Sequence, residues 1–176
     1  MDEIMLTEPA AHHAGEVWAL REEILSAGDE DAFAGCAGLE ACETYEKWLD
    51  RLRVWSDPAT VPEGRVSATV YIAVRQADGR VVGVIDLRHH IDHPVLSVWG
   101  GHIGYSVRPS ERGKGYATQM LRQCVKKARE RGIERVLVTC HPWNAPSERT
   151  IQACGGAFEN DVTVDGKAIR RYWIET

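Results

Sequence analysis

The most constraining feature of the sequence is a glycine-rich segment, Val107–Thr118, that joins a strand-like stretch to the most regular helical stretch of the chain. Gly113 and Gly115 allow the backbone to turn tightly and let a ligand approach closely. The first N–H groups of a helix have no partner within the helix, and the helix dipole is positive there. Arg112 and Lys114 add further positive charge. The segment therefore predicts a phosphate or pyrophosphate site where a strand runs into a helix.

The spacing of this segment departs from two other phosphate-binding motifs. A P-loop would need Gly where Arg108 stands and Ser or Thr where Gly115 stands. A dinucleotide-binding fingerprint would need Gly or Ala at Thr118 and an acidic residue at the end of the next strand, whereas Glu134 precedes that strand. A structural turn with solvated charges is the remaining alternative.

Hydrophobic periodicity predicts an alternation of strands and helices along the whole chain. Strands are expected at 4–6, 69–74, 80–87, 101–107 and 135–140 and on both sides of an Asp165-Gly166 hairpin turn. Helices are expected at 17–25, 44–55, 116–131 and 144–154, with a loop or short irregular helix at 28–42. The resulting order, β-α-α-β-β-β-α-β-α-β-β, predicts a single α/β or α+β domain over residues 1–176 with one mixed sheet.

Charge and composition exclude several classes of protein. The formal net charge is −5, which argues against a nucleic-acid partner. No run of about 18 apolar residues is present, so no membrane span is expected. The first eleven residues contain no Lys or Arg, unlike a signal peptide. The five cysteines form no CxxC pair, so we expect reduced thiols, no structural zinc and a cytoplasmic location.

Histidine and tryptophan residues provide weaker signals. His89, His90 and His93 could bind a metal only with a further ligand, so a solvated loop or one wall of an acceptor pocket is the favoured interpretation. Trp99 is expected to pack in the protein. Trp143 is either a hydrophobic staple on the following helix or an aromatic wall for a ligand.

The sequence Arg112-Gly-Lys-Gly-Tyr-Ala117 resembles the R/Q-x-x-G-x-G/A signature of the GNAT acetyltransferases. A second similarity lies at Asn144–Ser147, where family members open a helix with Asn near the pantetheine arm of CoA. The predicted element order is also that of the family, over essentially the whole chain, and the details look most like a poorly characterised bacterial subgroup. The resemblance implies a GNAT-like acyl-CoA N-acyltransferase fold, with a central twisted mixed sheet of about seven strands and helices on both faces.

The resemblance further implies acetyl-CoA as co-substrate, without a metal, between the strands that end at Val107 and Cys140. An amine would attack directly in a ternary complex, and a backbone N–H near Tyr105 would polarise the thioester carbonyl. The expected cofactor-binding residues are Tyr105, Ser106, Val107, Arg112, Gly113, Lys114, Gly115, Tyr116, Ala117, Thr118, Asn144 and Ser147.

The sequence departs from the family pattern at the expected acid. Many members carry Tyr seven residues after the helix-opening Asn, but Ile151 stands here. Tyr105, Ser147 and Cys140 are candidate substitutes, and water is another source of the proton. His102 is a candidate general base; the alternative is a strand-end histidine without a catalytic role.

The acceptor is expected to be a small cationic amine, such as a polyamine, an amino sugar or a lysine-like amine. In this fold the segment between the first two helices usually lines the acceptor side of the cleft. Here it carries Asp29, Glu30, Asp31 and Glu40, with Glu43 just beyond, and a negative rim attracts cations. The other interpretation is a solvated acidic loop.

Three further alternatives remain open at this point. The chain could transfer another acyl group, it could acylate an alcohol, or it could be a non-catalytic acyl-CoA-binding or regulatory module on the same fold. A homodimer is also an expectation from the resemblance, because members of this family often dimerise.

Overall fold

The computed structural model describes residues 2–176, and every predicted strand and helix is present in it. The strands are β1 (Ile4–Thr7), β2 (Ala68–Arg75), β3 (Val81–Arg88), β4 (Ile103–Val107), β5 (Arg135–Cys140), β6 (Ala157–Val164) and β7 (Lys167–Glu175). The helices are α1 (Ala14–Ala27), α2 (Tyr45–Ser56), α3 (Tyr116–Glu130) and α4 (Ala145–Ala153). Within residues 2–176, none of the helices has both the length and the apolar character that crossing a membrane requires.

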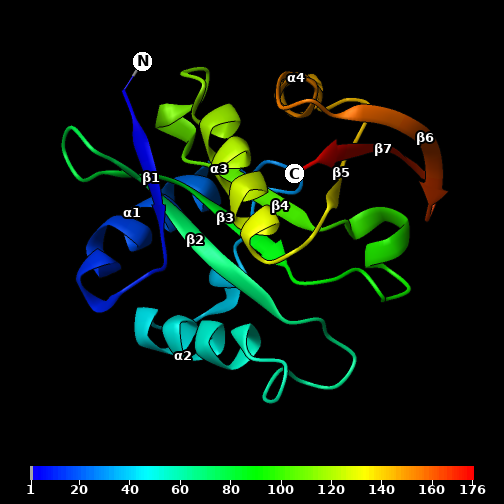
Figure 1. Cartoon of the computed structure of the whole chain (residues 1–176). Helices are drawn as coiled ribbons and strands as arrows, with labels where there is room; N and C mark the ends of the chain where they lie inside the picture. Colours follow the sequence, from blue (N-terminus) through cyan, green and yellow to red (C-terminus); the bar gives the residue numbers. More distant parts are fainter. Residues whose placement is uncertain (1) are drawn as a thin grey trace.

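The seven strands form two hydrogen-bonded sheets, of order β1-β2-β3-β4 and β5-β7-β6, in place of the one mixed sheet expected. All strand pairs within the two sheets are antiparallel. The sheets meet where the His102 N–H, just before β4, donates to the Leu137 carbonyl of β5 at 2.8 Å. The ladder does not continue because β4 and β5 diverge beyond this point. Figure 1 shows the three-stranded sheet with α4 on one side of the molecule and the four-stranded sheet with α1 and α2 on the other.

Helices cover both faces of the four-stranded sheet, as expected for an α/β fold of this class. On one face α1 and α2 bury Leu20 and Trp48 against strand residues such as Ile72. On the other face α3 buries Met120 and Leu121, which lie on the apolar stripe that predicted this helix. The strands are therefore held between two apolar layers, and their ends are free to shape a site.

Residues 28–42 form turns and one short 3-10 helix, Leu39–Ala41, rather than a regular helix. We call residues 28–42 the acidic segment. Its backbone is held by the buried Trp48 indole, which donates to the Cys36 carbonyl at 2.9 Å. It also lies directly against β4, because a Cβ placed on Gly35 would come within 2.1 Å of the Gly104 carbonyl oxygen. A glycine is therefore required where the segment crosses the strand.

Candidate active site

A cleft of about 1630 Å³ opens where β4 and β5 diverge. Its walls come from both strands, the start of α3, the start of α4 and the acidic segment. Eleven of the twelve expected cofactor-binding residues line it: Tyr105, Ser106, Val107, Arg112, Gly113, Gly115, Tyr116, Ala117, Thr118, Asn144 and Ser147. Neither Lys114 nor His102 belongs to the lining.

The edge of β4 presents unpaired N–H groups toward the cleft. The Arg108 N–H donates to the Val82 carbonyl of β3 at 2.9 Å. Along an antiparallel pair, residues alternate between those that bond to the neighbouring strand and those that point away from it. The N–H groups of Val107 and Tyr105 therefore point away from β3, toward the side where β5 has diverged.

The β4–α3 loop has the backbone that its sequence predicted. Gly113 and Gly115 both lie in the left-handed region, with φ of 76° and 81°. Gly115 is the N-cap of α3, and no side chain in residues 2–176 caps this helix end. The first N–H groups of α3 therefore remain free to bind an anion.

Both basic side chains of this loop are paired with carboxylates. Lys114 lies 2.8 Å from Glu111, and Arg112 lies 2.6 Å from Asp29 of the acidic segment. Glu111 is buried, and it also binds Arg75 at 2.9 Å. The hydrogen bond from Lys114 and these neighbouring cations hold the pKa of Glu111 below its usual value, despite the opposing effect of burial. The ionised Glu111 carboxylate therefore holds the β4–α3 loop in place through its ion pair with Lys114.

Tyr105 of β4 and Ser147 of α4 both line the cleft and contact each other. The Tyr105 Oη lies 2.6 Å from the Ser147 Oγ, and either oxygen can be the donor. Ser147 is held in turn by its own N–H, which donates to the Asn144 side chain at 3.2 Å. Burial raises the pKa of Tyr105, so its phenol remains protonated and can donate. Ile151 is fully buried in the core and does not reach this pair.

The structure places His102 between the two sheets and outside the cleft lining. His102 is 6 % exposed, and its Nδ1 accepts a hydrogen bond from the Leu137 N–H at 2.9 Å. Burial, with a smaller effect of the nearby Arg88, lowers the pKa of His102 to about 4. These observations favour the alternative of a strand-end histidine that joins β4 to β5. The face of this residue could not be read from the sequence, because the chain is irregular just before β4, where Gly101 has a φ of 67°.

Sequence reasoning missed His141, which lies directly after β5 and lines the cleft. Its Nε2 lies 2.9 Å from Asp31, and its Nδ1 lies 3.2 Å from the Ala168 carbonyl. Its ring stacks on Trp143 with centroids 5.2 Å apart. No local pattern could have signalled this cluster, because its members come from distant parts of the chain.

Two tryptophans of the cleft are exposed, in contrast to a packing role. Trp143 is 55 % exposed and Trp99 is 40 % exposed, and both belong to the lining. Trp143 therefore fits the aromatic-wall interpretation better than the staple.

The histidine cluster His89, His90 and His93 was the other weak signal in the sequence. Of these residues, His89 forms hydrogen bonds with the hydroxyls of Ser67 and Thr69. Within residues 2–176, no three His, Cys, Asp or Glu side chains are grouped in a way that could hold a metal.

Comparison with known proteins agrees with this geometry. A family model described as an acetyltransferase (GNAT) domain matches residues 3–157. Comparison with curated proteins gives no significant match.

Three solved structures illustrate the similarity of fold. The microcin C7 self-immunity acetyltransferase MccE, solved with acetyl-CoA and AMP, is 19% identical with a TM-score of 0.68, over 100% of this chain and 94% of that one. The ribosomal L7/L12 alpha-N-protein acetyltransferase RimL, solved with CoA, is 20% identical with a TM-score of 0.63, over 98% of each chain. A GNAT-family acetyltransferase from Bacillus anthracis is 19% identical with a TM-score of 0.62, over 99% and 96%. Since the family model spans most of the sequence, the chain belongs to the GNAT acetyltransferase family.

Proposed function

We propose that this protein transfers the acetyl group of acetyl-CoA to the amino group of a small cationic acceptor. The observation that carries the proposal is the β4–α3 loop, whose two left-handed glycines and uncapped helix start face the large cleft. Two structural neighbours, MccE and RimL, were solved with acetyl-CoA and CoA respectively, which supports the same class of co-substrate here.

The residues present fit a pyrophosphate at this position. The free N–H groups at the start of α3 supply hydrogen bonds, the helix dipole supplies positive potential, and Arg112 lies at the rim. When bound, acetyl-CoA would supply a thioester carbonyl that an amine can attack. The N–H of Tyr105 points into the cleft and can donate to the carbonyl oxygen as negative charge develops there.

Tyr105 and Ser147 are the side chains best placed to supply the proton that the leaving sulfur needs. Their oxygens are 2.6 Å apart and both residues line the cleft. The pair holds a proton that either oxygen can donate, and this compensates for the missing phenol at Ile151.

The acceptor side of the cleft favours a cation. Glu30 and Glu40 belong to its lining, and so do the exposed faces of Trp99 and Trp143. Carboxylates attract a cationic amine from solution, and an aromatic face stabilises it within about 6 Å of the ring. Asp29 and Asp31 contribute less to this attraction, since Asp29 is already paired with Arg112 and Asp31 lies against the His141 ring.

Thiol release from acetyl-CoA, measured across a panel of polyamines, amino sugars, amino acids and neutral amines, tests the proposal. We expect cationic amines to give the highest kcat/KM. Reversal of both Glu30 and Glu40 to Lys should lower that value much more than it lowers acetyl-CoA affinity. A protein that binds CoA but releases no thiol with any acceptor would instead be an acyl-CoA-binding module. Better turnover of neutral or anionic acceptors would refute the choice of acceptor.

A further inference from the structure

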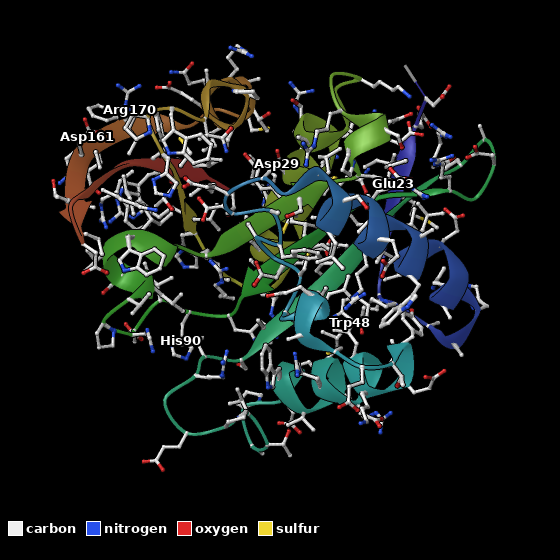
Figure 2. All side chains as sticks on the ribbon, turned by 180° about the vertical axis from the view of Figure 1, so that it is seen from behind. Glu23, Asp29, Trp48, His90, Asp161 and Arg170 are labelled. Atoms are coloured by element: carbon white, nitrogen blue, oxygen red, sulfur yellow. The ribbon has the colours of Figure 1, made fainter. Side chains whose placement is uncertain are left out.

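We propose that Asp29 is a built-in competitor for the anion that Arg112 binds, so that co-substrate entry requires an exchange of partners on this guanidinium. The inference rests on the proposed function, because it concerns the same β4–α3 loop. Asp29 Oδ2 lies 2.6 Å from Arg112 Nη1. The two residues are 83 positions apart and both line the cleft, so this pair joins the acidic segment to the β4–α3 loop. Figure 2 shows Asp29 on this segment, in this view between Glu23 of α1 and the three-stranded sheet that carries Arg170.

The acidic segment is anchored at several points that do not involve Arg112. Asp31 is paired with His141 at the opposite wall of the cleft, at 2.9 Å. The Ser106 hydroxyl of β4 donates to the Ala34 carbonyl at 2.8 Å. Gly35 packs against the backbone of Gly104. These contacts hold the segment in place when the ion pair between Asp29 and Arg112 breaks, so a rotation of the Asp29 side chain is enough to free Arg112.

Asp29 is the exchangeable carboxylate of the loop, in contrast to Glu111. Glu111 is buried and contacts three cationic side chains, Arg75, Arg80 and Lys114. The loss of a buried, multiply paired carboxylate is costly. Asp29 has a single such partner, and both side chains of the pair are 44% exposed. An exposed ion pair of this kind contributes about 0.2–1 kcal/mol, which a diphosphate carrying more charge can replace.

The arrangement predicts a gain of affinity when a carboxylate is removed. Asp29→Asn removes the carboxylate that competes for Arg112. The variant should therefore bind CoA about two- to fivefold more tightly than the unsubstituted protein, as measured by calorimetry. Glu30→Gln removes the adjacent charge without removing the partner of Arg112, and it controls for the general electrostatic effect. We expect it to change CoA affinity by less than about 1.5-fold, because exposed charges are screened by salt.

A double substitution separates local competition from a field effect. Arg112→Ala should weaken CoA binding, and Asp29→Asn added to it should give no further gain, because there is no guanidinium left to free. An equal gain in both backgrounds, or weaker binding by Asp29→Asn alone, would overturn the inference while the proposed function stands. Failure of the unsubstituted protein to bind CoA would refute the proposed function and this inference together.

Discussion

Replacement of His102 by Asn tests the structural role that this residue has at the junction of the two sheets. The Asn side-chain oxygen lies close to the position of Nδ1 in His, so it can still accept the hydrogen bond from the Leu137 N–H. What the substitution removes is the group that can be protonated. The neutral ring must keep Nδ1 free of a proton to accept that bond, which is made at 2.9 Å.

The magnitude follows from the lowered pKa of His102. Burial lowers it from 6.5 to about 4 in the folded protein. The unfolded chain therefore takes up the proton first as the pH falls, and the folded state loses stability between about pH 6.5 and about pH 4. Well above pH 6.5 the His102 ring is neutral in both the folded and the unfolded state, so none of this stability is lost. A difference of this size corresponds to about 3 kcal/mol over the whole window, because each pKa unit is worth about 1.4 kcal/mol.

Urea unfolding between about pH 7.5 and about pH 4.5 measures the effect through the free energy of unfolding. We expect the unsubstituted protein to lose about 2–3 kcal/mol more over this range than His102→Asn does. Val136→Ala, a buried position of β5 next to Leu137, is a matched control. It should be less stable at every pH, with a pH dependence parallel to that of the unsubstituted protein. Parallel curves for His102→Asn and the unsubstituted protein would refute the reasoning.

Four other substitutions and one control address the proposed site and its surroundings. Gly115→Val places a β-branched side chain at φ of 81° and should weaken CoA binding about tenfold or more by calorimetry. Gly132→Val is the control: this glycine follows α3 with a φ of 78°, so the substitution should strain the backbone similarly without weakening CoA binding. Tyr105→Phe and Ser147→Ala should each lower kcat by about 10- to 100-fold in the thiol-release assay with CoA affinity retained; unchanged rates for both would exclude them as acids. Ile151→Ala should lower the free energy of unfolding by about 2–5 kcal/mol and leave kcat within a few-fold, since the residue is fully buried.

The elements of this fold are predictable because each is specified by residues close together in the sequence. Thr44 was expected to begin the second helix, and its side chain accepts a hydrogen bond from the Lys47 N–H. Asp165 and Gly166 were expected to form a hairpin turn, and both have positive φ, at 48° and 77°. The β4–α3 loop belongs to the same group, because its glycines determine its backbone directly.

The missing parts of the site depend instead on contacts between distant residues. The His141 ring is held in the cleft by Asp31 and by the Ala168 carbonyl. These two residues lie on different elements, and no sequence pattern links them to His141. The division of the sheet follows from how β4 and β5 pack, and hydrophobic alternation within either strand is the same whether or not the two are paired. The burial of Glu111 has the same origin, since charged residues near turns are usually exposed.

The proposed co-substrate is strongly anionic, yet the chain itself carries a net charge of −5. The net charge therefore supplies no overall attraction for this anion, and before it binds the two basic side chains of the loop are paired with Glu111 and Asp29. The groups that remain are the backbone N–H donors of α3 and the edge of β4, which act over hydrogen-bond distances and need no free counter-charge. Recognition of the anion thus begins at the backbone, and Arg112 joins it once the anion has replaced Asp29 on the guanidinium. The acidic side chains that remain unpaired in the cleft are then left to attract the cationic acceptor.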